Sequence, residues 1–123
     1  MRPPDDVLLR DMRDHARRAV AALTGKERAE FDSDPILAAA LERFIEVVGE
    51  AASKVSPTTQ AATPTIPWRE IVEMRNRLVH GYASVDHDIV WDVVTGDLPA
   101  VVGSKRCLPK SRASRTETEH TTQ

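Results

Sequence analysis

The sequence predicts an all-α protein, an antiparallel up-and-down bundle of four to five helices. Three observations support this prediction. Apolar residues recur at steps of three and four, helix-capping residues bound these stretches, and no stretch shows the polar–apolar alternation of a strand. Short connections favour antiparallel neighbours. With 123 residues and 4% aromatic residues, we expect one domain with an aliphatic core.

The first expected helix covers residues 5–23. Pro4, Asp5 and Asp6 suit its beginning, and Gly25 suits its end. One face of this helix is apolar and is formed by Leu8, Met12, Ala16, Ala19 and Leu23.

A second, longer helix follows the capping residue Asp34 and Pro35. Its apolar positions are Leu37, Leu41, Phe44, Val48, Ala51 and Val55. Gly49 lies inside this helix at a cost of about 1 kcal/mol relative to Ala. We interpret Gly49 as a point of close approach between two helices.

Residues 56–66 are rich in Thr and Pro without periodicity and predict a loop. Pro67 then begins a third helix that Gly81 is expected to end. The residues expected to face inward are Ile71, Met74, Leu78 and Trp68.

Asp86 or Asp88 can cap a short fourth helix that Gly96 is expected to stop, with one more turn over residues 99–102. The interpretation is therefore one helical domain over residues 1–103, followed by a basic, disordered tail over residues 104–123.

Charge and composition limit the classes of function. The net charge of −2 combines +3 in residues 104–123 with −5 in the remainder, so the domain is no general nucleic-acid binder, and RNA would need a locally basic cleft. The single cysteine, Cys107, excludes an internal disulfide and a cysteine-cluster metal site. No membrane span or secretory signal is evident, so we expect a cytoplasmic protein.

Four groups with chemical potential follow one another near the expected end of the third helix: Arg75, Asn76, His80 and Tyr82. Arg presents a planar fork of donors to a phosphate, and His transfers protons near neutral pH. Together they can cleave RNA without a metal. The alternative is a purely structural role, in which a cation near the end of the helix complements the helix dipole. At about 100° per residue, Arg75 and His80 lie roughly 140° apart, so a helix end in a dimer would suit the site.

Two other sets of polar residues could serve either a functional or a structural role. Asp86, His87 and Asp88 have metal-ligand chemistry, but the histidine spacing favours helix capping, and we expect no metal site. Glu50 either holds Arg75 or Arg77 or lies on a solvated helix face.

The stretch Arg75-x4-His80-x-Tyr82 resembles the Arg-x4-His-x-Tyr motif of HepT-like toxins, the DUF86 group of HEPN domains. Further segments agree in the same order, over roughly residues 5–103: 48–52 (VGEAA), 66–71 (IPWREI), 85–86 (VD), 89–92 (IVWD) and 97–99 (DLP).

This resemblance implies a homodimeric HEPN-like bundle, the toxin of a type VII toxin–antitoxin module. Arg75 and His80 would be its catalytic ribonuclease pair, with Asn76 and Tyr82 supporting. The partners would be RNA and an MntA-like minimal nucleotidyltransferase antitoxin. That antitoxin would transfer AMP from ATP to Tyr82 and place negative charge in the cleft. No cofactor, membrane or DNA partner is expected. The alternative is a non-catalytic dimeric interaction module that the nucleotidyltransferase binds and modifies.

Overall fold

The computed structural model describes residues 3–79 and 86–104, and every regular element in these two ranges is helical. The elements in chain order are α1 (Asp5–Leu23), α2 (Arg28–Asp32), α3 (Pro35–Lys54), α4 (Pro57–Ala62), α5 (Trp68–Val79), α6 (His87–Asp92), the π-helical turn η1 (Val93–Asp97) and α7 (Leu98–Val102). The all-α prediction is confirmed. The tail boundary and its disorder stay predictions, because residues 105–123 lie outside the described part.

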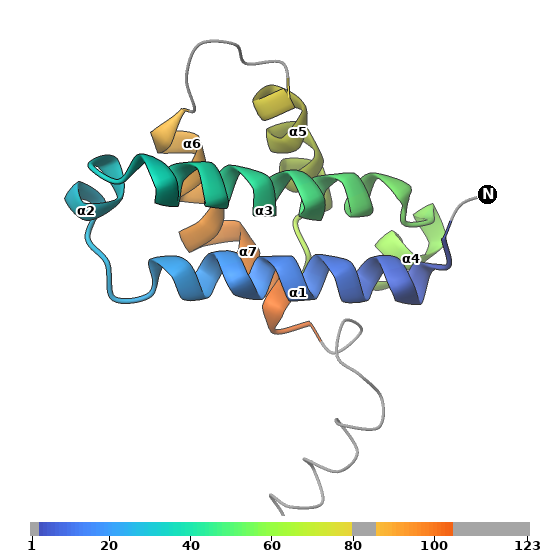
Figure 1. Cartoon of the computed structure of the whole chain (residues 1–123). Helices are drawn as coiled ribbons and strands as arrows, with labels where there is room; N and C mark the ends of the chain where they lie inside the picture. Colours follow the sequence, from blue (N-terminus) through green and yellow to red (C-terminus); the bar gives the residue numbers. More distant parts are fainter. Residues whose placement is uncertain (1–2, 80–85, 105–123) are drawn as a thin grey trace, which may run out of the picture.

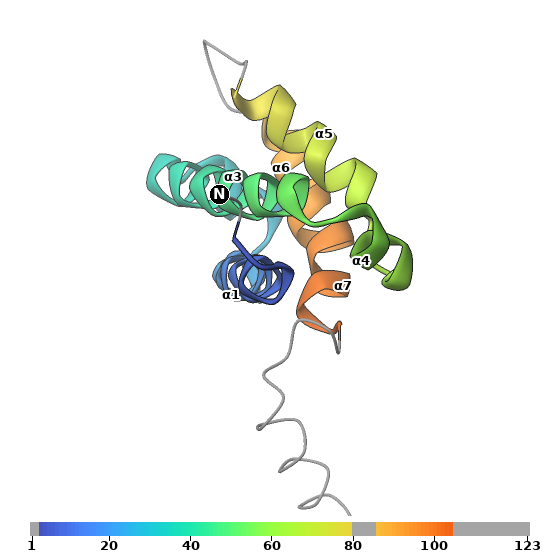
Figure 2. The ribbon, with the colours of Figure 1, turned by 90° about the vertical axis from the view of Figure 1, so that its right-hand side faces the viewer.

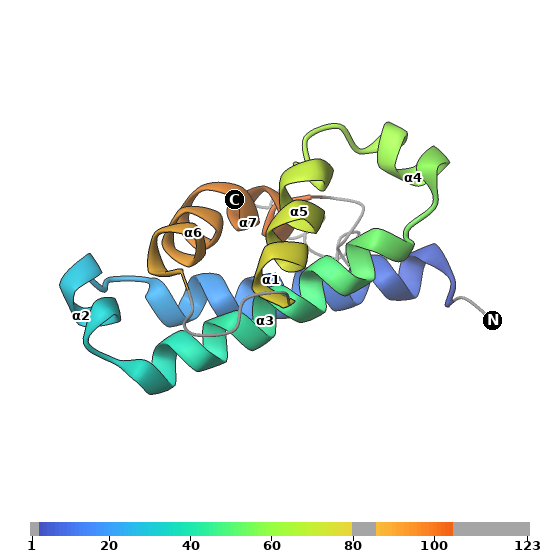
Figure 3. The ribbon, with the colours of Figure 1, turned by 90° about the horizontal axis from the view of Figure 1, so that it is seen from above.

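Two helical layers form the bundle (Figure 1). The long helices α1 and α3 run antiparallel, and α5 and the α6–η1–α7 segment form a second antiparallel pair that crosses them (Figure 2). α5 packs mainly on α3, and α7 packs on α1. The short helices α2 and α4 lie at opposite ends of the long pair (Figure 3). The C-terminal end of α5 therefore projects from the body of the bundle.

The ends of both long helices match their sequence signals. Gly25, just past the end of α1, has a φ of 79°, a backbone conformation that glycine adopts without strain. The side chain of Asp34 accepts a hydrogen bond from the N–H of Leu37 at 3.0 Å, and Pro35 occupies the first turn of α3.

Most of the residues predicted to face inward form the core. On α3, however, Leu37 and Phe44 are only partly buried. The buried face of α3 is wider than the predicted stripe because α1 and α5 pack on different sides of it. The additional buried positions on α3 are Ala38, Ile45, Gly49 and Ala52.

The prediction of a loop over residues 56–66 is wrong, because α4 forms there. Ser56 caps α4 by accepting a hydrogen bond from the N–H of Thr59 at 3.3 Å. The carboxylate of Asp5 accepts hydrogen bonds from the hydroxyls of Ser56 and Thr59, both at 2.6 Å. A six-residue helix shows no periodicity, but Ser56-Pro57 repeats the cap-and-proline signature of Asp34-Pro35.

The prediction that Gly96 stops the fourth helix is also wrong. The chain continues through η1, where the N–H of Leu98 bonds to the carbonyl of Val93, and reaches the extra turn predicted at residues 99–102. The apolar face continues across this turn, with Val94 and Leu98 both buried, so packing outweighs the low helix propensity of glycine.

Helix α2 was not predicted. It begins with a reciprocal capping box between Glu27 and Glu30 and buries the side chain of Phe31 completely. Across residues 3–79 and 86–104, every helix is too short or too polar to traverse a lipid bilayer.

Candidate functional site

Two of the four predicted site residues lie on the described part of α5. Arg75 and Asn76 occupy its C-terminal half, and the helix is described to Val79. His80 and Tyr82 lie outside the described residues, as does Gly81, the expected end of the helix. The described geometry therefore concerns the arginine side of the site.

Gly49 on α3 provides the space in which the Arg75 side chain lies. A Cβ atom built on Gly49 would lie 2.2 Å from Cβ and 2.6 Å from Cγ of Arg75, far inside van der Waals contact. Only a residue without a side chain lets α5 approach α3 this closely. The interpretation of Gly49 as a close-approach position is confirmed.

The Arg75 guanidinium is held on both terminal nitrogens. Nη2 donates to Oε1 of Glu50 in a short ion pair, and Nη1 donates to Oδ1 of Asn76 at 3.0 Å. Oε2 of Glu50 lies 3.2 Å from Nζ of Lys54, one turn further along α3. Of the two alternatives for Glu50, the structure supports the contact with Arg75. The Glu50 carboxylate thus holds one cation on each oxygen.

A hollow of about 380 Å³ lies beside these residues, between α1, α3 and the stem of Arg75. Its apolar lining includes Leu8 and Ala51. Its basic residues are each paired with an acid: Arg43 lies 3.7 Å from Glu46, and Lys54 and Arg75 share Glu50. A phosphate bound here would compete with carboxylates for these cations.

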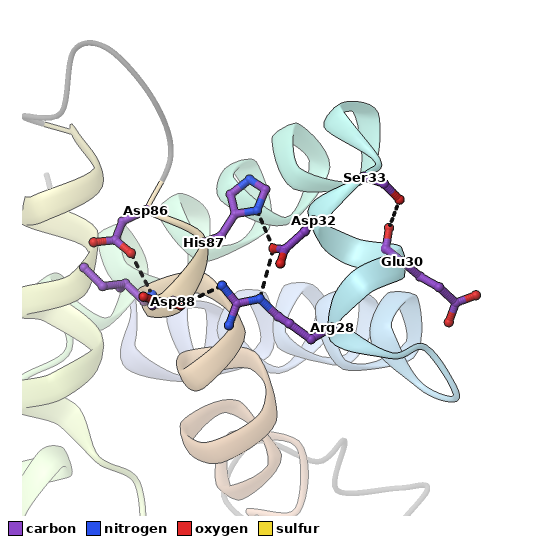
Figure 4. A network of polar contacts seen from close by, with 8 residues as sticks. Arg28, Glu30, Asp32, Ser33, Asp86, His87 and Asp88 are labelled. Carbon is purple, nitrogen blue, oxygen red and sulfur yellow. Dashed lines mark hydrogen bonds and ion pairs between the residues drawn. The ribbon is translucent and has the colours of Figure 1, made fainter.

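A second polar cluster joins α2 to the beginning of α6 (Figure 4). Arg28 donates to Asp32 at 2.9 Å and to Asp88 at 2.6 Å, and Nδ1 of His87 lies 2.8 Å from Oδ1 of Asp32. The ring of His87 also packs against buried Phe31, with centroids 4.6 Å apart. This cluster fixes the start of α6, the first element after the segment that carries His80 and Tyr82.

The interpretation of Asp86, His87 and Asp88 as capping and surface residues agrees with this geometry. Asp86 caps α6 by accepting a hydrogen bond from the N–H of Ile89 at 3.2 Å. His87 and Asp88 are engaged by α2. Within residues 3–79 and 86–104, no three His, Cys, Asp or Glu side chains come together as a metal-binding group.

The α2–α6 cluster predicts a pH dependence of stability. The hydrogen bond from His87, and then that from Arg28, lower the pKa of Asp32 below its ordinary value of 3.8. A carboxylate with a lowered folded-state pKa stabilises the fold above its ordinary pKa, and this contribution is lost as the pH falls through the folded-state pKa. We expect Asp32→Asn to lower the melting temperature at pH 7, and the difference from the parent protein to be smaller near pH 2. An equal difference at both pH values would contradict this origin.

The arrangement at Arg75 suits the binding of an oxyanion. A guanidinium carries five N–H donors, and the contacts with Glu50 and Asn76 engage one donor on each terminal nitrogen. Donors therefore remain for a phosphate. The Arg75 side chain is 28% exposed, so it is accessible while its stem is packed on Gly49.

Comparisons with known proteins agree with the sequence resemblance. Residues 12–103 match the pattern of the family described as "Ribonuclease HepT-like". The chain is 37% identical over 71 residues to "Probable ribonuclease HepT" of Thermococcus cleftensis, covering 58% of this chain and 64% of that protein. It is 33% identical over 70 residues to a "Putative RNase" of Caldanaerobacter subterraneus, covering 57% of this chain and 62% of that protein.

A "Putative RNase" of Methanocaldococcus jannaschii is 32% identical over 72 residues, covering 58% of this chain and 66% of that protein. The chain thus spans slightly less than two thirds of the length of these three relatives. No solved structure matches the chain.

Proposed function

Because the chain belongs to the HepT-like ribonuclease family, we propose that it is a metal-independent endoribonuclease with Arg75 and His80 as its catalytic residues. One observation carries the proposal: the Arg75 guanidinium is held near the end of α5, accessible to a phosphate, five residues before His80. Asn76, which accepts from Arg75, supports the guanidinium.

The chemistry needs only these groups. The His80 imidazole takes the proton from the 2′-hydroxyl, and the 2′-oxygen forms a bond to phosphorus while the bond between phosphorus and the 5′-oxygen breaks. The leaving 5′-oxygen receives a proton from the imidazolium or from water, so the products are a 2′,3′-cyclic phosphate and a 5′-hydroxyl. Negative charge grows on the phosphate oxygens in the transition state, and the Arg75 guanidinium stabilises it. Arg is suited to this role because it stays charged at every relevant pH.

The active assembly is proposed to be a homodimer. On a straight helix Arg75 and His80 point roughly 140° apart, so one copy of the motif does not bring both groups to the same phosphate. A second copy of the chain, placed with its motif against the first, would supply the missing group and form one shared cleft.

The family resemblance supports a proposal for the biological role. We place the protein as the toxin of a type VII toxin–antitoxin module, silenced when an MntA-like nucleotidyltransferase transfers AMP from ATP to Tyr82. An added AMP would occupy the RNA cleft and repel RNA phosphates through its negative charge.

The test is RNA cleavage by the purified, unmodified protein, with and without EDTA. We expect fragments to appear at the same rate under both conditions. Loss of cleavage on chelation, restored by a divalent cation, would contradict metal independence. Protein co-expressed with the nucleotidyltransferase should show AMP on the Tyr82 peptide by mass spectrometry and should no longer cleave RNA.

The alternative is a non-catalytic dimeric module that binds the nucleotidyltransferase and is modified by it. Its support is the charge of residues 1–103, net −5, and the pairing of every basic residue in the hollow with an acid. A folded, unmodified dimer that leaves RNA intact and still accepts AMP on Tyr82 would favour this module over the ribonuclease.

A further inference from the structure

We propose that Glu50 is a positioning residue for RNA cleavage, which holds the Arg75 guanidinium in the orientation that the reaction needs. The inference rests on the proposed ribonuclease function and adds a residue outside the Arg-x4-His-x-Tyr motif. Glu50 lies on α3, twenty-five positions before Arg75 in the sequence, and reaches it through the packing of α5 on α3.

Glu50 is itself held by a cation on each carboxylate oxygen. Lys54 lies 3.2 Å from Oε2, and Nη2 of Arg75 donates to Oε1. A carboxylate with a cation on each oxygen has little freedom to rotate. Glu50 therefore gives Arg75 a hydrogen-bond acceptor at a fixed position and does not act only as a nearby negative charge.

Arg75 makes three separate contacts with the protein. Its stem lies against Gly49, Nη2 is bound by Glu50 and Nη1 by Asn76. Surface arginines are ordinarily mobile, because a long side chain loses much rotamer entropy when it is ordered. Three contacts from two helices order this one before substrate arrives, and such preorganisation is what electrostatic stabilisation of a transition state requires.

The guanidinium of Arg75 keeps N–H donors available for a phosphate. The contacts with Glu50 and Asn76 leave Nε–H and a second N–H on each terminal nitrogen for a phosphate. The Arg75 side chain is 28% exposed, so a phosphate can reach it from solvent while Glu50 holds it from α3. A shift of about 1 Å in such a group can reduce the rate about 100-fold.

The key variant is Glu50→Gln, which keeps the shape and one acceptor oxygen but removes the charge. We expect kcat for RNA cleavage to fall at least about tenfold while KM changes less than about threefold. Glu50→Asp keeps the charge but retracts it by one methylene, so we expect a similar loss of kcat. The matched control is Glu73→Gln on α5, which removes one charge from an exposed pair with Arg69.

A double variant distinguishes a positioning role of Glu50 from a merely structural one. In an Arg75→Ala background, Glu50→Gln should reduce the residual rate no further, because its effect acts through Arg75. An equal loss in both backgrounds would show that Glu50 acts elsewhere and would overturn the inference. Thermal unfolding of each variant checks that the fold is retained.

The remaining outcomes are also decisive. If the parent protein cleaves RNA and Glu50→Gln cleaves at the same rate, the positioning role is wrong and the ribonuclease function stands. If Glu50→Gln cleaves RNA faster than the parent protein, Glu50 inhibits Arg75 instead of assisting it, and the inference is wrong. If the unmodified parent protein does not cleave RNA, the proposed function fails and the inference fails with it.

Discussion

Arg75→Ala is expected to lower the rate of RNA cleavage by about 1,000-fold, because removing a preorganised donor to a developing oxyanion costs about 100- to 1,000-fold and Arg75 supplies several donors. The stability cost should be small. The Arg75–Glu50 pair is partly exposed, such pairs contribute about 0–1 kcal/mol, and Glu50 keeps Lys54 as a partner. Cleavage of a labelled RNA and thermal unfolding measure the two effects separately.

Two substitutions sharpen this test. Arg77→Ala removes the same charge from an exposed position on the same helix and should leave cleavage within about threefold of the parent rate. His80→Ala should abolish cleavage. The double variant Arg75→Ala/His80→Ala should cleave RNA no more slowly than the slower of the two single variants, because the effects of residues that act as a unit are not additive. Parental rates in Arg75→Ala or His80→Ala would remove the catalytic assignment.

Gly49→Ala is expected to destabilise the fold, although alanine is the better helix former. The propensity gain is about 1 kcal/mol. Against it, the new Cβ would lie 2.2 Å from Cβ of Arg75, and overpacking of this kind costs about 1–3 kcal/mol. Since the opposing atom is at the base of the side chain, relief requires α5 to move from α3. Urea unfolding should show a net loss of up to about 2 kcal/mol, with reduced RNA cleavage.

The matched control is Gly96→Ala in η1. A Cβ built on Gly96 meets no atom within 4 Å, so the substitution should be neutral or slightly stabilising. Replacing Arg75 by Ala should not rescue Gly49→Ala fully, because Ala retains the Cβ atom that causes the overlap. Equal stability of Gly49→Ala and the parent protein would show that the two helices separate without cost.

Much of the fold could be predicted from the sequence because its long helices carry strong local signals. The stripe of α1 and the Asp34–Pro35 start of α3 identify elements that packing then confirms. The short helices could not be found by periodicity. α4 depends on the distant carboxylate of Asp5, and α2 depends on burial of Phe31. In both cases tertiary contacts stabilise a helix that is too short to form alone.

The candidate site shows the same division. Arg75 and Asn76 can be identified in the sequence because several different polar side chains lie close together in residues 75–82. Their positions relative to α3 cannot be predicted from the local sequence. The role of Glu50 stayed open in the sequence, because its neighbouring residues do not distinguish a solvent-exposed position from one that contacts the next long helix. The contact between α3 and α5 decides it. His80 and Tyr82 keep their sequence-based roles as predictions.

The close approach at Gly49 also suggests a way to recognise distant members of this group. Gly49 and Glu50 are adjacent on α3 and both contact Arg75: the missing side chain of Gly49 permits the close helix crossing, and the carboxylate of Glu50 pairs with the guanidinium. We therefore expect a chain that packs these two helices in the same way to carry a glycine–acid pair in the second long helix and an arginine near the end of the next long one. This pattern could be searched for in chains whose local motif has drifted.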